Sequence, residues 1–343
     1  MRVDTKGVAQ GLCVLASLAA ISIGPGAAAD DFYQGKTISF IIGSAPGGGY
    51  DTYSRLVAAH IGRHLPGNPA VVPQNMPGAN SAKAAFHLYN AAPKDGTTIG
   101  MVDEAIYLHQ ILEPQEAKTD ATKFNWIGRI IPNSAVLFAR SDAKVQRIED
   151  AFSTELIVSA SGAASTLNWT VLTNLLGVKF KILSGYQGSS ESMLAMLRGE
   201  VDALSMPWSI LKNTGSQMLQ EKKINLLLQT GAEKDSALPH VPRMIDLARN
   251  EDERKLLEFF ASPGLIGRSV IAPPGLPPER VTELRRAFMA AMKDPALLAD
   301  VQKAKLSLDP MSGEALQAAF GHIGIMPESL VTRAREVAGI KHK

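Results

Sequence analysis

The segment of this sequence with the clearest chemical potential is Pro46-Gly47-Gly48-Gly49-Tyr50-Asp51, preceded by Ala45. The apolar run before it predicts a buried strand, and the spacing of apolar residues after it predicts a helix. Glycines let a backbone turn tightly and approach a ligand, while the free N–H groups at a helix start attract an anion. The loop therefore predicts a site for a small anion such as a carboxylate. Strand-to-helix turns also use glycine for geometry alone, so this loop by itself leaves both interpretations open.

Two more small polar turns repeat the arrangement later in the chain. Ser161-Gly162-Ala163-Ala164-Ser165-Thr166 lies between a predicted strand and a predicted helix, and so does Tyr186-Gln187-Gly188-Ser189. In the simpler interpretation, Ser165 or Thr166 only caps its helix. Open α/β sheets bind ligands at the carboxyl ends of their strands, so turns from two lobes can converge on one cleft there. That geometry suits a small anion with a carboxylate at one or both ends.

Two single side chains add to the candidate site. Glu104 ends a predicted strand on the side where a ligand would lie, and a carboxylate is unusual in a site that captures carboxylates. We hypothesise that Glu104 selects a ligand bearing a hydroxyl or ammonium group, or repels a second negative charge. An exposed or capping glutamate is the alternative. Trp208, next to Pro207, is a candidate apolar wall of the cleft, with plain packing as its alternative.

Strand-like and helix-like segments alternate along the chain, which predicts an α/β protein with mostly parallel sheets flanked by helices. Around residues 131–141 the chain is expected to cross into a second lobe, and near 231–243 it is expected to return. We therefore expect residues 30–131 and 236–343 to form lobe 1, and 132–235 to form lobe 2. The expected strands are Thr37–Gly43, Ala70–Gln74, Thr98–Val102, Ala135–Ala139, Leu156–Ala160, Phe180–Leu183, Val201–Ser205, Ile224–Gln229 and Val270–Ala272. The expected helices include Thr52–His64, Ser81–Tyr89, Thr166–Leu176 and Ser190–Leu197.

The first 29 residues have the pattern of a secretory signal peptide. Arg2 and Lys6 give the positive start, a short apolar run follows, and small residues precede a cleavage point expected near Ala29. The run is too short to span a bilayer, so we expect a periplasmic protein. Cys13, the only cysteine in the sequence, lies inside this run, which is poor context for the alternative of a lipid anchor. The mature chain would then contain no disulfide, thiol nucleophile or thiolate metal site.

Charge and motifs argue against several function classes. The formal net charge of +2 over 343 residues disfavours nucleic acid or an anionic membrane as a partner. The sequence has no G-x-S-x-G elbow, and His60 and His64, four residues apart, lack the glutamate of an H-E-x-x-H site. We expect no enzyme, no metal site and no cofactor. A hydrolase or isomerase that uses Asp51 or Asp202 is the alternative.

A series of short landmarks runs in order over nearly the whole mature chain. They are Pro46-Gly47-Gly48 with Asp51 and Arg55; Asn75-Met76-Pro77-Gly78-Ala79; Ala92-Pro93-Lys94-Asp95-Gly96; Gly185-Tyr186-Gln187-Gly188-Ser189 with Leu197, Gly199, Val201 and Asp202; Leu238-Pro239-His240-Val241-Pro242; and Ala272-Pro273-Pro274-Gly275-Leu276-Pro277. In these residues the chain resembles the receptor component of tripartite tricarboxylate transporters, the Bug family. The resemblance implies a type II periplasmic binding fold whose lobes close over a carboxylate held by loop backbone groups and ordered waters. It also implies a large and a small membrane subunit as partners in ion-driven uptake.

The resemblance also implies which residues contact the ligand. It assigns this role to the first loop, through Ala45, Pro46, Gly47, Gly48 and Asp51, and to the two later turns, 161–166 and 186–188. Asp202 matches a family position, although an aspartate at a strand start supports a turn equally well. Asn80-Ser81 replaces a glycine pair of the family, and this departure leaves the ligand open among dicarboxylates, tricarboxylates, aromatic acids and amino acids. We expect a monomer, and a sensor module for a membrane signalling receptor is the alternative to a transport receptor.

Overall fold

The computed structural model describes residues 1, 31–79, 81–115, 117–160, 163–186, 188–323 and 327–340. The expected signal peptide, apart from Met1, lies outside the described residues, as do the candidate site residues Asn80, Ser161 and Gly162. Across these described ranges, every helix falls short of the length and apolar character that a bilayer span requires.

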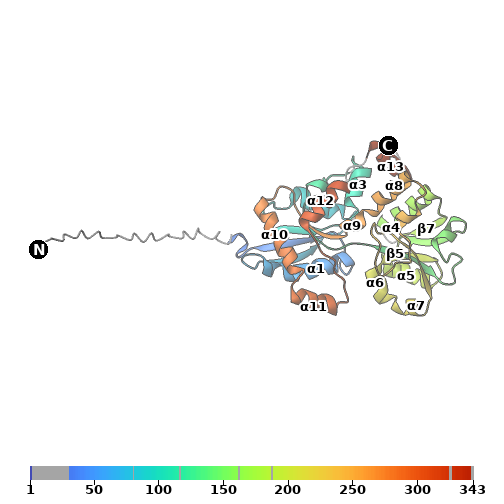
Figure 1. Ribbon diagram of the computed structural model, residues 1–343, viewed down its shortest axis with the longest axis horizontal. Helices are drawn as coiled ribbons and strands as arrows, with labels where there is room; N and C mark the ends of the chain where they lie inside the picture. The colour runs from blue at the N-terminus through green and yellow to red at the C-terminus, as the bar shows by residue number, and fades with distance from the viewer. Residues whose placement is uncertain are drawn as a thin grey trace.

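The first lobe, on the left in Figure 1, is built on a mixed six-stranded sheet. Its first strand is almost continuously apolar and buried, as expected for a strand covered on both faces. This strand, β1, pairs in parallel with β2 and β3, whereas β10 runs antiparallel between β3 and β4. In spatial order the strands are β11 (Met311–Ser312), β4 (Asn125–Ile131), β10 (Arg268–Ala272), β3 (Thr98–Met101), β1 (Thr37–Ile42) and β2 (Ala70–Asn75).

The second lobe, on the right in Figure 1, holds a five-stranded sheet. Strand β6 pairs in parallel with β7 and β8, and β5 runs antiparallel to both β8 and β9. The carboxyl ends of β6, β7 and β8 are followed by helices α4, α5 and α6. In spatial order the strands are β7 (Phe180–Ser184), β6 (Leu156–Ala160), β8 (Ala203–Pro207), β5 (Ala135–Arg140) and β9 (Ile224–Gln229). The predicted fold of two α/β lobes is confirmed.

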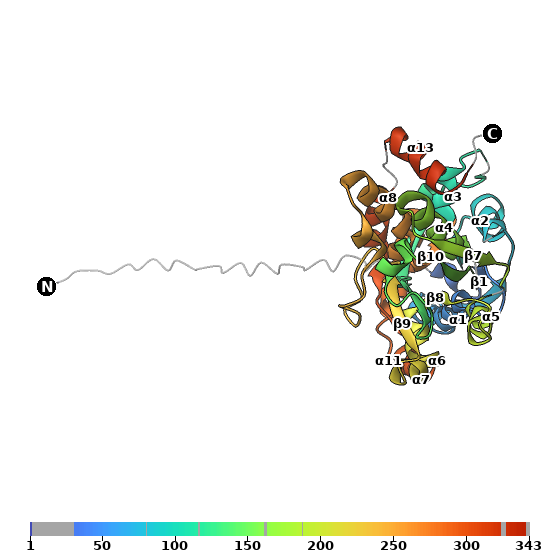
Figure 2. The same ribbon diagram turned by 90° about the vertical axis from the view of Figure 1, so that its right-hand side faces the viewer.

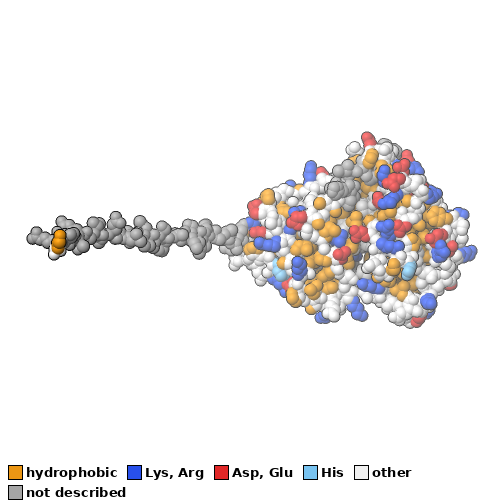
Figure 3. Space-filling model, in the orientation of Figure 1, with side chains coloured by type: hydrophobic (Ala, Val, Ile, Leu, Met, Phe, Trp, Pro, Cys, Tyr) orange, Lys and Arg blue, Asp and Glu red, His pale blue; other side chains and the backbone are white. Residues whose placement is uncertain are grey.

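Helices cover both sheets, and the ones that begin beside the cleft matter most for function. Helices α1 and α10 pack together over the first sheet, and α4 and α5 pack on strands of the second. The α-helices are α1 (Gly49–Ile61), α2 (Ala82–Phe86), α3 (Ile106–Leu112), α4 (Ala163–Val171), α5 (Ser189–Leu197), α6 (Trp208–Thr214), α7 (Ser216–Gln220), α8 (Glu251–Ala261), α9 (Pro263–Ile266), α10 (Pro278–Ala291), α11 (Pro295–Lys303), α12 (Gly313–Ile323) and α13 (Glu328–Val337). On the face drawn in Figure 3, acidic and basic side chains are interspersed.

The first helix begins earlier than the predicted range Thr52–His64, at Gly49. Gly48 takes an extended conformation as the N-terminal cap, and the Asp51 carboxylate accepts a hydrogen bond from the Gly47 N–H at 2.9 Å. An acidic side chain in the first turn stabilises a helix start, which offsets the low helix propensity of glycine. The earlier start places Tyr50 in the first turn of α1.

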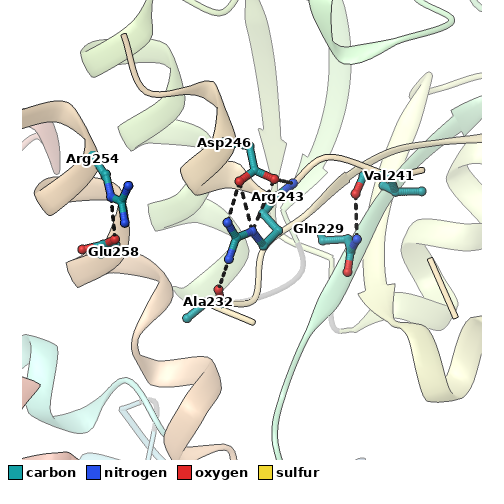
Figure 4. A network of polar contacts seen from close by, with 7 residues as sticks. All are labelled: Gln229, Ala232, Val241, Arg243, Asp246, Arg254 and Glu258. Carbon is teal, nitrogen blue, oxygen red and sulfur yellow. Dashed lines mark hydrogen bonds and ion pairs between the residues drawn. The ribbon is translucent and has the colours of Figure 1, made fainter. Parts of the chain in front are cut away.

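The return crossing lies further along the chain than the predicted range 231–243. The Gln229 side-chain amide donates to the Val241 carbonyl, and the Arg243 guanidinium donates to the Ala232 carbonyl (Figure 4). The same Gln229 amide also donates to the Leu238 carbonyl. These bonds attach the segment after β9 to the second lobe. The predicted lobe boundary at residues 235 and 236 therefore does not match the chain path, because buried amide pairing holds this segment in place.

Helix α8 also stays with the second lobe, since the neighbouring Arg249 donates to the Leu175 carbonyl there. The two connections between the lobes are residues 132–134 and the short helix α9. They lie side by side, because the Asn133 N–H donates to the Gly264 carbonyl at 2.9 Å. The hinge thus pairs 132–134 with α9.

Further contacts tie the lobes together on either side of the hinge. The Tyr107 and Ser262 hydroxyls are hydrogen-bonded, and α13 contacts α3 while its Val337 carbonyl accepts a bond from Asn174 of the second lobe. Figures 1 and 2 both show α3, α8 and α13 gathered at this end of the molecule. At another edge, Lys212 of α6 bonds the Ser307 hydroxyl. The lobes are therefore in contact beyond the hinge.

Candidate functional site

A cavity of about 240 Å³ lies between the lobes, with the hinge as its floor. The first lobe contributes the start of α1 and the segment after β3. The second lobe contributes the first turns of α4 and α5 and the end of β8. Polar residues from every wall face it: Tyr50, Asp103, Glu104, Asn133, Ser165, Asn168, Ser189, Ser205 and Thr230. The carboxyl ends of strands in both sheets thus open onto one space, where α/β proteins bind ligands.

The glycine loop lies behind this cavity, and only Tyr50 of the motif lines it. Asp51 is buried and accepts hydrogen bonds from the Gly47 N–H, from Arg55 at 2.9 Å and from Asn75 at 2.8 Å. Although burial acts in the opposite direction, these bonds lower the pKa of Asp51 to about 2. The positive end of α1 therefore already holds a carboxylate of its own chain.

The second lobe brings the predicted turns to the cavity. Ala164 and Ser165, in the first turn of α4, line it together with Asn168 one turn later. Ser189 is the first residue of α5 and also lines it, with Gly188 as the helix cap. Among the remaining described positions of these turns, Thr166, Tyr186 and Gly188 adjoin the lining residues without belonging to the lining. The side chain of Ala163 lies outside the described part of the chain.

The first lobe places two carboxyl groups on the opposite wall. Glu104 is 6% exposed, and its Oε1 accepts a hydrogen bond from the Asn133 side-chain amide. Its backbone N–H donates to the Tyr50 hydroxyl at 3.3 Å. Burial raises the pKa of Glu104 and also the pKa of its neighbour Asp103, while the positive charge of Arg268 acts against both shifts. This wall therefore presents two buried carboxyl groups whose ionised forms are disfavoured by burial.

Arg268, at the start of β10, balances part of this charge from behind the wall. The side chain is 5% exposed, and its guanidinium carbon lies 5.7 Å from the ring centre of Tyr50 and 5.1 Å from that of Tyr53. A guanidinium over aromatic faces is attracted by the ring quadrupole. A Cβ at Gly49 would lie 2.7 Å from Arg268 Nη2, so glycine leaves the space that the guanidinium fills.

Three predicted site residues lie away from the cavity lining. The Ser81 hydroxyl donates to the Gly43 carbonyl at 2.9 Å and so joins two loops of the first lobe. Asp202 accepts from the Ile157 N–H at 3.1 Å and pairs with Arg140, which braces the start of β8. Trp208 lines a neighbouring cavity of about 500 Å³ on the other side of Pro207.

Comparison with known proteins identifies the fold's family. A sequence model described as the tripartite tricarboxylate transporter family receptor matches residues 54–320, most of the chain. The chain belongs to this family. A UPF0065 protein from the TAR-I ttuE-ttuC' intergenic region of Agrobacterium vitis is 25% identical to the receptor over 280 residues, which cover 79% of this chain and 76% of the relative.

Solved structures show the same fold as the receptor. A TctC solute-binding protein from Polaromonas is 19% identical with a TM-score of 0.64, and the match covers 88% of this chain and 98% of that one. MatC from Rhodopseudomonas palustris, solved with bound malate, is 21% identical with a TM-score of 0.61, over 88% of this chain and 98% of that one. The predicted resemblance to this receptor family is confirmed.

Several residues that shape the receptor's cavity were not among the sequence candidates. Asn133 lies between the largely buried strands β4 and β5, and Arg268 opens the fully buried strand β10. A polar or charged residue within a buried apolar segment needs a hydrogen-bond or charge partner, and this rule could have pointed to Asn133 and Arg268 from the sequence. Asn168 follows from extending the predicted turn by one helical turn into α4, and Ser189 already ended the predicted turn that begins at Tyr186.

Proposed function

We propose that this chain is an extracytoplasmic solute receptor that binds a small carboxylate between its lobes and delivers it to a tripartite tricarboxylate transporter. The observation that carries the proposal is the meeting of α4 and α5 starts at the interlobe cavity. The first N–H groups of a helix lack intrahelical partners and its dipole is positive there, so two such starts attract a negative ligand. Family membership and the fold shared with a malate-bound protein support it.

In the proposed complex, the ligand carboxylate accepts hydrogen bonds from first-turn amides of α4 and α5. Ser165, Asn168 and Ser189 add side-chain donors from the same wall. Tyr50 and Glu104 close the opposite wall, and the loop 45–49 positions Tyr50 through the cap of α1. The anion therefore binds to the second lobe, since Asp51 already occupies the positive end of α1.

Ligand capture proceeds by lobe closure around the hinge formed by residues 132–134 and α9. A ligand between the walls contacts both lobes only when they are close, so it shifts the open and closed populations by its differential contacts. The family is a family of receptors, and the proposed role involves no covalent step. Residues 1–29 act as a signal peptide cleaved near Ala29, and the mature monomer works in the periplasm with a large and a small membrane subunit.

Two serine-to-aspartate substitutions in the second lobe test the site. Ser189→Asp adds a carboxylate to the cavity wall, whereas Ser141→Asp adds one at an exposed position after β5, outside the cavity lining. A thermal-shift screen of carboxylates on the mature chain selects a ligand, because specific binding raises the melting temperature by mass action. Titration calorimetry then compares the variants with that ligand.

We expect Ser189→Asp to weaken binding by at least about tenfold, since like charges a few ångströms apart repel by more than RT even under partial screening. Ser141→Asp should bind as the parent does. Equal affinity of both variants, or no stabilisation by any carboxylate, would contradict the proposal.

A further inference from the structure

The cavity contains a buried acceptor that the protein itself does not use. Glu104 lines the cavity and is more than nine-tenths buried, yet its Oε2 has no hydrogen-bond partner. Buried polar atoms in native proteins are almost always paired, so an unpaired carboxylate oxygen calls for a donor from outside the chain. The other oxygen, Oε1, is already satisfied by Asn133.

A second unused acceptor lies beside the first. The Asn133 side chain donates through its nitrogen to Glu104, and its Oδ1 is buried without a partner. Asn133 also lines the cavity. Two acceptors facing one space require N–H or O–H groups, and an ionised carboxylate has neither. The ligand's carboxylate therefore does not satisfy this wall.

The charge of the lining points to the same conclusion. Among the described residues that line the cavity, the charged side chains are Asp103 and Glu104, both acidic. Arg268 is the cation whose field reaches both, and it lies behind the wall between the rings of Tyr50 and Tyr53. Burial disfavours the ionised forms of both carboxyl groups, so a positive group of the ligand that contacts them would stabilise their charged forms. A second ligand carboxylate would meet repulsion there.

We infer that the receptor's ligand is an amino monocarboxylate whose ammonium group binds Glu104 Oε2 and Asn133 Oδ1 while its carboxylate faces the starts of α4 and α5. This inference rests on the proposed function and names the ligand class for the same cavity. Acceptors with negative charge form one wall, and helix starts with serine and asparagine side chains form the other. A zwitterion matches both walls, and a dicarboxylate matches only one.

Matched ligands of equal carbon number test the inference by calorimetry. The set comprises the 2-amino and ω-amino monocarboxylates of four to six carbons, the corresponding unsubstituted and 2-hydroxy monocarboxylates, and the dicarboxylates. We expect at least one amino monocarboxylate to bind about tenfold to a hundredfold more tightly than its unsubstituted and hydroxy counterparts, as expected for a charged hydrogen bond. Tighter binding of the dicarboxylate, or equal binding of the hydroxy acid, would overturn the inference.

Three variants assign the preference to residues. Glu104→Gln should reduce the preference for the ammonium group over the unsubstituted acid to within about threefold. Asn133→Ser, which keeps Glu104 intact, should reduce it partly. Glu149→Gln, the control, removes an exposed carboxylate of the second lobe and should leave the preference for the ammonium group unchanged. Thermal unfolding verifies that each variant folds.

The outcomes separate this inference from the function on which it depends. If carboxylates bind but Glu104→Gln keeps the full preference, the ammonium assignment is wrong and the receptor function stands. If a protonated Glu104 instead donates a hydrogen bond to the ligand carboxylate, the amide of Glu104→Gln will donate that bond equally well. Unsubstituted acids will then bind best to both proteins, which also refutes the assignment. If no carboxylate of any class binds, the proposed function itself fails.

Discussion

Replacing Asp51 by asparagine tests the explanation for how the first loop is held. The carboxylate accepts hydrogen bonds from the Gly47 N–H, Arg55 and Asn75, and it lies only 5% exposed at the start of α1. Asparagine keeps one acceptor oxygen, but it loses the negative charge and directs N–H groups toward other donors. We therefore expect the loop and the start of α1 to lose stability together.

The size of the effect follows from the pKa of Asp51. These hydrogen bonds lower it from 3.8 to about 2. At about 1.4 kcal/mol per pKa unit, the ionised carboxylate stabilises the folded state by about 2 kcal/mol at neutral pH. This figure is an upper one, because the Arg55 side chain is largely exposed and water screens its charge.

The pH dependence has a definite sign. The folded-state pKa lies below the unfolded-state value, so the stabilisation is present above pH 3.8 and is lost as the pH falls through about 2. Urea unfolding of the parent and Asp51→Asn between pH 7 and pH 2 measures the difference. We expect the free energy of unfolding of Asp51→Asn to be about 2 kcal/mol below that of the parent at pH 7, and we expect this difference to shrink mostly between pH 4 and pH 2.

An exposed carboxylate provides the control for this titration. The Asp142 side chain is 77% exposed, and Asp142→Asn should change the free energy of unfolding by less than about 1 kcal/mol at any pH. A loss of unfolding free energy for Asp51→Asn that stays constant down to pH 2, or that equals the loss for Asp142→Asn at pH 7, would contradict this role of the Asp51 carboxylate.

Three further substitutions have expected outcomes in urea unfolding or ligand titration. Gly267→Ala should lower the free energy of unfolding by about 2 kcal/mol or more. Gly267 has a φ of +51°, and a Cβ there would lie 2.3 Å from the Ile131 carbonyl oxygen at the hinge. An unchanged unfolding midpoint would contradict this expectation. Gly49→Ala should displace the Arg268 guanidinium, and the loss of ligand-binding free energy should exceed the loss of unfolding free energy. A destabilised variant with the ligand affinity of the parent would show that the position of Arg268 does not affect binding. Phe288→Ala should cost about 3 to 5 kcal/mol, since the ring is fully buried in the core of the first lobe, and should leave affinity unchanged in the folded fraction.

The buried strands were the most predictable elements. The run from Thr37 to Ile42 is apolar at nearly every position, and a strand covered on both faces requires that pattern. The start of α1 was less predictable, because glycine has low helix propensity. The contact of Asp51 with Arg55 is local, but its contacts with the Gly47 N–H and with Asn75 depend on the fold of the loop and of β2. Local pattern identified the element, and side-chain contacts set its first residue.

The path between the lobes could not be read from local pattern. Residues 238–243 contain prolines and resemble a linker, yet the Gln229 amide binds them to the second lobe through contacts that no spacing rule encodes. The candidate site shows the same limit. Turns of α4 and α5 were predicted from their glycine and serine residues, whereas Asn133 and Arg268 became site residues only through long-range packing beside Glu104.

A crystal structure of the mature chain with a carboxylate selected by thermal shift shows where the ligand binds. We expect closed lobes with the ligand in the cavity between them, and its carboxylate within hydrogen-bonding distance of first-turn N–H groups of α4 or α5. A ligand bound outside the cavity, or one whose carboxylate contacts Glu104 and Asp103 instead of those helix starts, would contradict it.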